Sequence, residues 1–219
     1  DQQARLLATA GEDLRPDVYS HSSIRNLYLD TPDFRLIRRS LEKPVYKEKL
    51  RLRSYGRTER DSPVFMELKK KYRSIVYKRR LTLPYDRALD CLTGACPWPE
   101  TQIGGEIRYT VDFYPDLESR VFLAYERDSW LAPESGLRIT FDDAIRFRTE
   151  ELTMDSDPWG TALLGPDQVL MELKAPGAIP LWMVRLLTEM RLYKTSFSKY
   201  GTAYQLLLER EWKGGKRYA

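Results

Sequence analysis

The sequence has few of the residues that build redox, zinc or imidazole-based sites. Its 219 residues include two cysteines and one histidine. Cys91 and Cys96 form a C-x4-C pair with no histidine nearby, which is too few ligands at too wide a spacing for a zinc site. We expect both to be reduced thiols, with a structural disulfide as the alternative. His21 lies in a segment that we interpret as a polar loop, and we expect it to have no functional role.

Long apolar runs are also absent. No uncharged apolar stretch approaches the roughly 18 residues that a membrane span requires, and no charged-then-apolar signal segment opens the chain. We therefore expect a cytoplasmic protein. The hydrophobic content of 42%, with 14 Tyr and 5 Trp, is enough for a packed core. Because no linker divides the chain, we expect one domain over residues 1–219.

Charge is distributed unevenly along the chain. The formal net charge is +4, but residues 43–80 contain 14 Lys or Arg against 4 Asp or Glu, a local +10 that leaves −6 for the rest. Such a concentration predicts either a basic outer surface that meets a polyanion or a basic interior that holds one. Composition leaves both alternatives open.

Hydrophobic alternation predicts a protein built mainly from strands. Eight segments have period two, at residues 24–30, 46–55, 64–71, 75–83, 107–112, 121–128, 137–147 and 169–174. Helices are expected only at residues 4–10, 86–93, 181–192 and 201–212, and residues 150–168 resemble a surface loop. This pattern favours an α+β, mainly β fold, an antiparallel and roughly eight-stranded barrel or sandwich with flanking helices.

The phase of the charges within these strands is informative. Side chains alternate between the two faces of a strand, so Arg51 and Arg53 share one face while Leu50 and Leu52 share the other. An ordinary half-buried strand explains any one such pattern. Six strands with the same pattern favour a barrel lined with bases and wide enough for a phosphate chain. The remaining charged faces carry Lys47 and Lys49, Glu67 and Lys69, Lys78 and Arg80, Arg127, Arg138 and Asp142, and Glu172 and Lys174.

Two strands repeat the same four residues. Met-Glu-Leu-Lys occurs at residues 66–69 and again at residues 171–174. A carboxylate two residues from a lysine lies on the same strand face. The carboxylate can hold a hard divalent cation, and the lysine can hold the phosphate oxygens bound to that cation.

Several stretches together resemble a known family. They are IRNLYLDTPDF (24–34), KEKLRLRSYG (47–56), VFMELKKKY (64–72), VYKRRL (76–81), LAYERDSW (123–130), GLRITFDD (136–143), VLMELK (169–174) and FSKYGTA (197–203). In this order they resemble the VTC domain, the polyphosphate polymerase of the triphosphate tunnel metalloenzyme superfamily. The resemblance implies an antiparallel tunnel that transfers the γ-phosphate of ATP to polyphosphate, releases ADP and requires Mn²⁺ or Mg²⁺. It implies ATP and polyphosphate as partners and no nucleic acid. Whether a membrane-associated partner exists is not readable from this chain.

The resemblance also implies a set of site residues. Glu172 matches the metal-binding glutamate of the family, and Lys49, Arg80 and Lys174 share strand faces with matched residues and complete the binding set. Glu67 is either a second metal ligand or the partner of a neighbouring base in an internal salt bridge, and Asp142 is equally open. The matched phosphate ligands are Arg51, Arg53, Lys69, Lys78, Arg127, Arg138 and Lys199.

Two features depart from the family pattern. Family members carry a strand with an E-x-K-Y-like motif before the first helix, and none precedes Ala4. Ser196 stands where eukaryotic members have a second lysine, and Lys194 is the candidate substitute. Two other functions therefore stay under consideration, a tunnel triphosphatase that hydrolyses inorganic or organic triphosphates and a non-catalytic polyanion-binding module.

Overall fold

The computed structural model describes residues 2–213, which fall into two compact units. The first unit comprises residues 1–23, 125–145 and 164–197. The second comprises residues 24–124, 146–163 and 198–219. Each unit is described by itself below. The single domain expected over residues 1–219 stays a prediction.

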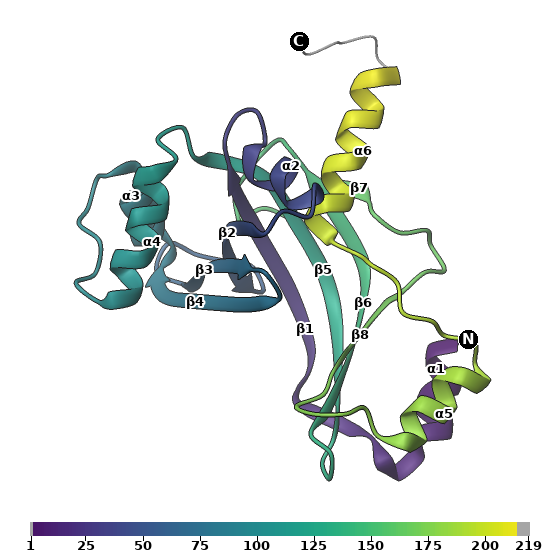
Figure 1. Cartoon of the computed structure of the whole chain (residues 1–219). Helices are drawn as coiled ribbons and strands as arrows, with labels where there is room; N and C mark the ends of the chain where they lie inside the picture. The colour runs from purple at the N-terminus through teal and green to yellow at the C-terminus, as the bar shows by residue number, and fades with distance from the viewer. Residues whose placement is uncertain (1, 214–219) are drawn as a thin grey trace. The chain divides into compact units, whose positions relative to one another are not determined.

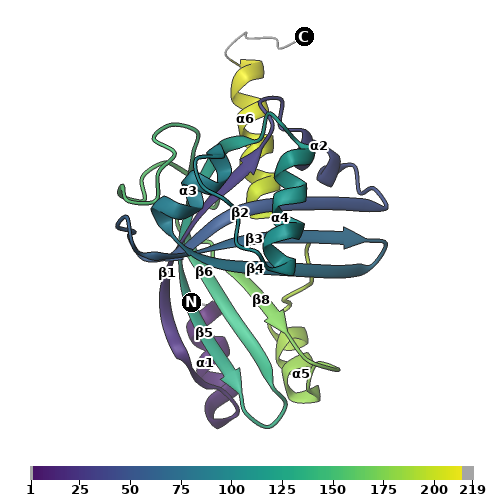
Figure 2. The same ribbon diagram turned by 90° about the vertical axis from the view of Figure 1, so that its left-hand side faces the viewer.

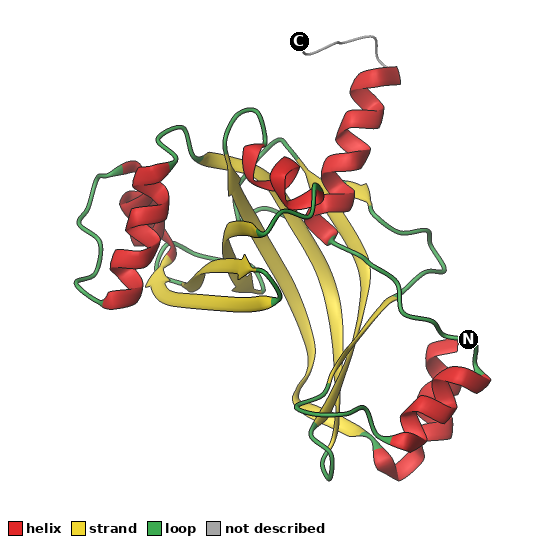
Figure 3. Cartoon of the chain, in the orientation of Figure 1, coloured by secondary structure: helices red, strands yellow, loops and turns green. Residues whose placement is uncertain are grey.

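The strands form one eight-stranded sheet in the order β4-β3-β2-β1-β5-β6-β7, with β8 paired to β6 (Figure 3). The fold class is therefore α+β and mainly β, as predicted, with six helices among the described residues. The strands are β1 (Arg15–Asp30), β2 (Tyr46–Tyr55), β3 (Pro63–Tyr72), β4 (Ile75–Pro84), β5 (Glu118–Ala132), β6 (Leu137–Arg148), β7 (Thr161–Ala162) and β8 (Leu170–Lys174). The helices are α1 (Gln2–Ala10), α2 (Arg35–Leu41), α3 (Tyr85–Thr93), α4 (Gln102–Phe113), α5 (Leu181–Glu189) and α6 (Lys199–Lys213), with a short 3₁₀ helix at Gly11–Asp13.

The second unit is organised by the alternation of β2 and β3. These strands are antiparallel, with Leu50 opposite Leu68 and Leu52 opposite Met66. All four side chains are fully buried, in a core that includes residues of α3 and α4 such as Ile107. Figure 2 shows α4 lying across these strands. Because the helices cover the apolar face, the basic residues of β2, β3 and β4 share the opposite face.

The first unit has its own apolar core. Alternate residues of β6, among them Leu137 and Ile139, pack with Leu6 of α1 and with Met183 and Leu186 of α5. Figure 1 shows α1 and α5 side by side. Strand β6 also pairs with β8. In this antiparallel register Thr140 lies opposite Glu172, and Arg138 lies opposite Lys174.

Two local expectations are wrong. Residues 107–112 are part of helix α4, not a strand. The helix begins where the Thr101 side chain accepts a hydrogen bond from the Gly104 N–H (3.0 Å), and it buries Gly104, Ile107 and Thr110 at helical spacing. His21 lies within strand β1 and not in a polar loop, because β1 begins at Arg15. Residues 150–168 are mainly loop, as predicted, apart from the two-residue strand β7, which pairs with β6.

Helix α2 was not predicted from the sequence, although it buries Leu36, Ile37 and Ser40. Cys91 and Cys96 are free thiols, as predicted. Their Sγ atoms lie 3.0 Å apart. Burial raises the pKa of Cys91 to about 11, which disfavours the reactive thiolate. Over the described part of the chain, no helix combines the length and the apolar character needed to cross a membrane.

Candidate functional site

One buried carboxylate organises the basic face of the second unit. The register of β2, β3 and β4 places Arg51 and Arg80 on either side of Glu67. Arg51 donates to Glu67 Oε2 from Nη2 (2.7 Å) and Nε (2.9 Å), and Arg80 donates to Oε1 from Nη2 (2.5 Å). Lys78 Nζ lies 2.8 Å from Oε1, and Arg53 Nε lies 3.8 Å from Oε2. We call these five residues the Glu67 cluster.

The electrostatics of Glu67 follow from this arrangement. The side chain is 2% exposed, and burial alone would raise its pKa. Arg51, Arg53 and Lys78 outweigh that effect and hold the pKa well below its ordinary range. Both carboxylate oxygens are therefore engaged by cations, which matches the internal salt bridge rather than the metal ligand that the sequence left as alternatives.

A tyrosine pair connects the Glu67 cluster to the start of helix α6. Arg51 Nη1 donates to the Tyr28 hydroxyl oxygen (2.9 Å), and the Tyr28 ring stacks on Tyr200 with centroids 4.4 Å apart. Tyr200 in turn donates to Asp30 Oδ2 (2.8 Å). The Tyr28 ring is buried, which raises its pKa, but Arg51 and Lys49 lower it by more. Sequence reasoning missed this network, although its residues lie inside the matched IRNLYLDTPDF and FSKYGTA stretches.

The same segment anchors helix α2. Asp30 accepts hydrogen bonds from the backbone N–H groups of Leu36 (2.8 Å) and Ile37 (3.0 Å) in the first turn of α2. Asp30 is fully buried, and burial raises its pKa against these hydrogen bonds. One carboxylate thus fixes α2 and, through Tyr200, the first turn of α6.

Three further predicted lysines belong to the second unit: Lys49 and Lys69 continue the basic face of the Glu67 cluster, and Lys199 begins α6. Lys49 is opposite Lys69, and Lys69 is opposite Lys78 in the strand register. Lys49 Nζ donates to Ser198 Oγ (3.1 Å), and Lys199 is the next residue and opens α6. Burial lowers the pKa of Lys49, and an anion bound beside it would counteract that shift.

The first unit contains a different arrangement. Arg127 on β5 makes a bidentate pair with Asp142 on β6, Nε to Oδ1 at 2.6 Å and Nη2 to Oδ2 at 2.8 Å. Glu172 on β8 is the second neighbour, with its carboxylate 3.8 Å from Arg127 and 3.8 Å from Lys174 Nζ. Burial lowers the pKa of Arg127, but the hydrogen bonds to Asp142 raise it by more. We call these four residues the Arg127 cluster.

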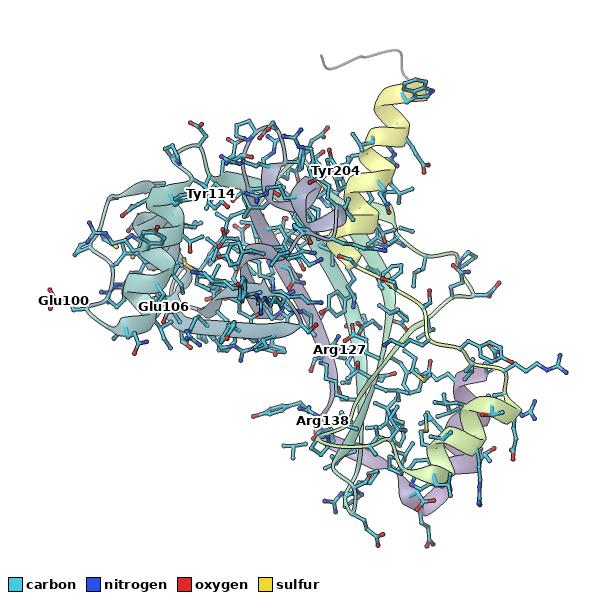
Figure 4. The ribbon with its side chains drawn as sticks, viewed as in Figure 1. Glu100, Glu106, Tyr114, Arg127, Arg138 and Tyr204 are labelled. Atoms are coloured by element: carbon cyan, nitrogen blue, oxygen red, sulfur yellow. The ribbon has the colours of Figure 1, made fainter. Side chains whose placement is uncertain are left out.

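Arg138 has a different environment from the other predicted phosphate ligands. It lies near the start of β6, on the same face as Asp142, and Figure 4 shows it below Arg127 of β5. Its guanidinium pairs with Asp17 of β1, and its side chain is about half exposed. The first unit thus brings Arg127, Asp142 and Glu172 into one cluster and places Arg138 beside Lys174.

A metal ion would have to share its coordination with phosphate. Among residues 2–213 no three His, Cys, Asp or Glu side chains are grouped so that they could hold a metal. In the Arg127 cluster the Asp142 side chain is fully buried against Arg127, whereas the Glu172 side chain is 36% exposed. Mg²⁺ is usually held by one or two carboxylates plus substrate phosphates and water. Glu172 fits that role, and the donor set does not fit a closed protein cage.

Comparison with protein families decides the identity of the fold. The model of the VTC domain matches residues 1–208. The chain belongs to the VTC domain family. The family assignment and the antiparallel, mainly β fold expected from the sequence motifs are therefore both confirmed.

Solved structures agree with this VTC-family fold. Thirteen chains of solved structures match. One of them is described as a "putative adenylate cyclase" from Bacillus halodurans, with a TM-score of 0.53, 14% identity, and coverage of 90% of this chain and 87% of that one. At this identity the likeness shows the fold alone. Comparison with curated protein sequences gives no match.

Proposed function

We propose that this VTC-family domain is a polyphosphate polymerase that transfers the γ-phosphate of ATP to a growing polyphosphate chain and releases ADP. The observation that carries the proposal is the basic face of β2, β3 and β4, where four cationic side chains surround one buried carboxylate. Residues 43–80 contain 14 basic and 4 acidic residues, a charge excess that favours binding of a strongly anionic partner. Polyphosphate and the triphosphate of ATP have that chemistry.

The residues of both clusters would act by positioning and by neutralising charge. Phosphoryl transfer needs little covalent assistance, because the main obstacle is repulsion between anionic reactants. Arg51 and Arg53 offer planar forks that can bind two phosphate oxygens each, and Lys69 and Lys78 offer compact charges. A Mn²⁺ or Mg²⁺ ion held by Glu172 supplies further neutralisation of phosphate oxygens when it is bound.

The Glu67 cluster is suited to this task because it is preorganised. Glu67 Oε2 lies 2.7 Å from Arg51 Nη2, and Glu67 Oε1 lies 2.5 Å from Arg80 Nη2, so the carboxylate orients both guanidinium groups. Tyr28 fixes Arg51 from the other side. Side chains that are already oriented lose little conformational freedom on binding, so more of their interaction energy stabilises the transferred phosphoryl group. No general base is needed, since the terminal phosphate that attacks is already ionised.

The test is product analysis after incubation with ATP and Mn²⁺. The proposal expects long polyphosphate and ADP. Arg51→Ala and Glu172→Ala are each expected to lower synthesis by on the order of 10²–10³, the usual effect of losing one preorganised ligand. Arg108→Ala is the matched control, because Arg108 pairs with Asp112 on the surface of α4. Unfolding curves must show that all three variants fold.

The alternatives predict other outcomes. If orthophosphate were the only product, the domain would be assigned as a tunnel triphosphatase and not as a polymerase. Polyphosphate binding without turnover, unaffected by Glu172→Ala, would indicate a non-catalytic polyanion-binding module. Full synthetic activity in the Arg51→Ala variant would contradict the assignment of the Glu67 cluster.

A further inference from the structure

The turn between β3 and β4 exposes an unusual group of apolar side chains. Ile75, Val76 and Tyr72 at this turn are 59%, 49% and 46% exposed. The Arg73 N–H donates to the carbonyl oxygen of Val45 (2.7 Å), so the segment before β2 lies beside the turn. Val45 is 62% exposed. We call Val45, Tyr72, Ile75 and Val76 the hairpin tip.

The exposed side chains of the hairpin tip point to both faces of the sheet. Tyr72 is opposite Ile75, and Lys71 is opposite Val76. By strand alternation Tyr72 and Ile75 share the face that the helices cover further along, while Val76 shares the face of Lys78. A protein partner or a second copy that packs on one face would leave the other apolar side exposed. A bilayer surrounds an inserted hairpin on all sides.

Basic residues surround the hairpin tip. Residues 69–78 contain five Lys or Arg and no Asp or Glu. Lys43 and Arg73 are exposed beside the tip, and the Arg73 guanidinium lies 5.4 Å from the centre of the Tyr72 ring. Single exposed apolar residues are normal on protein surfaces, but a cluster of this kind marks an interaction site. Aliphatic and aromatic side chains surrounded by basic residues are typical of surfaces that bind anionic lipids.

We infer that the hairpin tip docks end-on into an anionic phospholipid bilayer. The apolar side chains of the tip enter the interfacial layer, and Lys43, Lys70, Lys71 and Arg73 remain among the lipid headgroups. Tyr72 is suited to the boundary because its ring is apolar and its hydroxyl is polar. The inference is independent of the proposed polymerase activity, since it requires neither ATP nor polyphosphate.

The test is sedimentation with vesicles of phosphatidylcholine, with and without phosphatidylserine. The wild type is expected to bind the vesicles that contain phosphatidylserine and to lose binding as salt is raised. Ile75→Ser/Val76→Ser is expected to weaken partitioning by at least about tenfold through the lost apolar contact. Lys70→Gln/Lys71→Gln is expected to weaken it by about fivefold per residue.

A matched control separates docking from general surface polarity. Val18→Ser/Val184→Ser removes two exposed apolar side chains from the first unit and is expected to bind vesicles like the wild type. Equal binding of the wild type to vesicles with and without phosphatidylserine would overturn the inference, as would undiminished binding of Ile75→Ser/Val76→Ser. Concentration-dependent self-association without vesicle binding, abolished by the same double variant, would assign the tip to a second copy instead.

Discussion

The two units of this chain use carboxylates in opposite ways. In the second unit Glu67 is shared by four cations, so several arginines and lysines converge on one anionic centre. In the first unit Arg127 donates two hydrogen bonds to the buried carboxylate of Asp142 in a bidentate pair. Glu172 lies 3.8 Å from Arg127, and its side chain is 36% exposed.

This difference separates two tasks. Four cations around one carboxylate stay oriented and close together although they repel one another. A site that binds a polyanion needs such a concentration of positive charge. A buried bidentate pair holds two strands together. Removing one partner lowers the free energy of unfolding strongly, because the other partner is then an uncompensated buried charge. The comparison predicts that substitutions in the two clusters differ in kind. Substitutions in the Glu67 cluster should change activity and make stability depend less on acid pH, whereas substitutions in the Arg127–Asp142 pair should mainly lower stability.

The largest stability effect is expected from Asp142→Asn. Asp142 is fully buried, and the substitution leaves Arg127 without its bidentate partner. Breaking a buried pair typically costs about 3–5 kcal/mol of unfolding free energy. We expect the lower end of that range because Glu172 remains 3.8 Å away. Urea unfolding followed by tryptophan fluorescence measures the loss.

The control for this prediction is Asp17→Asn in the same unit. Asp17 pairs with Arg138, whose side chain is about half exposed. The Asp17 side chain is 11% exposed and that of Arg138 is 54% exposed, so solvent screens this pair more than the Arg127–Asp142 pair and its loss should be smaller. Similar losses for the two variants would mean that the Arg127–Asp142 pair is not structurally special, and the comparison of the two units would fail.

A smaller effect is expected in the acid stability of the second unit. The pKa of Glu67 is depressed in the folded protein, so its stabilisation is present above the unfolded value and is lost as pH falls. Below the unfolded pKa of about 4.3, this one group should remove about 1.4 kcal/mol per pH unit. Glu67→Gln should be less stable than the wild type at neutral pH, and the difference should shrink with acidification.

Urea unfolding of both proteins from neutral pH down to about pH 3, below the unfolded pKa of glutamate, checks this convergence. Glu42→Gln controls for the loss of one carboxyl group at an exposed position. A constant difference between wild type and Glu67→Gln across this range would show that the four cations do not hold the ionised form of Glu67.

The basic face itself could be predicted from the sequence. Strands have period two, and in β2 the alternation of Lys or Arg with Leu is strict from Lys49 to Arg53. Fully buried Leu50 and Leu52 leave the charged residues on the other face, whatever the rest of the chain does. Register within a hairpin is also local, so the neighbours of Glu67 on β2 and β4 follow from short sequence separations.

What could not be predicted depends on long-range contacts and on ambiguous short segments. Tyr200 and Asp30 are 170 residues apart, and no local pattern indicates that they are hydrogen-bonded. Residues 107–112 alternate like a strand, but only six residues do not distinguish periods of 2 and 3.6. The Thr101 cap and the buried Gly104 decide for a helix. The phosphate-binding and metal-binding roles of all the predicted site residues stay predictions.

The smallest expected effect concerns His21 in the first unit. Its Nδ1 lies 2.8 Å from Asp128 Oδ1, and Glu126 is 3.4 Å from Nε2. Asp128 raises the pKa of His21, more than the opposing effect of burial. The resulting stabilisation is present below the unfolded pKa of about 6.5 and is lost as pH rises through the folded value.

Because the chain has one histidine, a single imidazole NMR resonance reports the titration. Asp128→Asn should lower the midpoint, and Asp143→Asn, a more weakly coupled neighbour, should lower it less. An unchanged midpoint in Asp128→Asn would show that this exposed pair, unlike Arg127–Asp142, does not persist in solution.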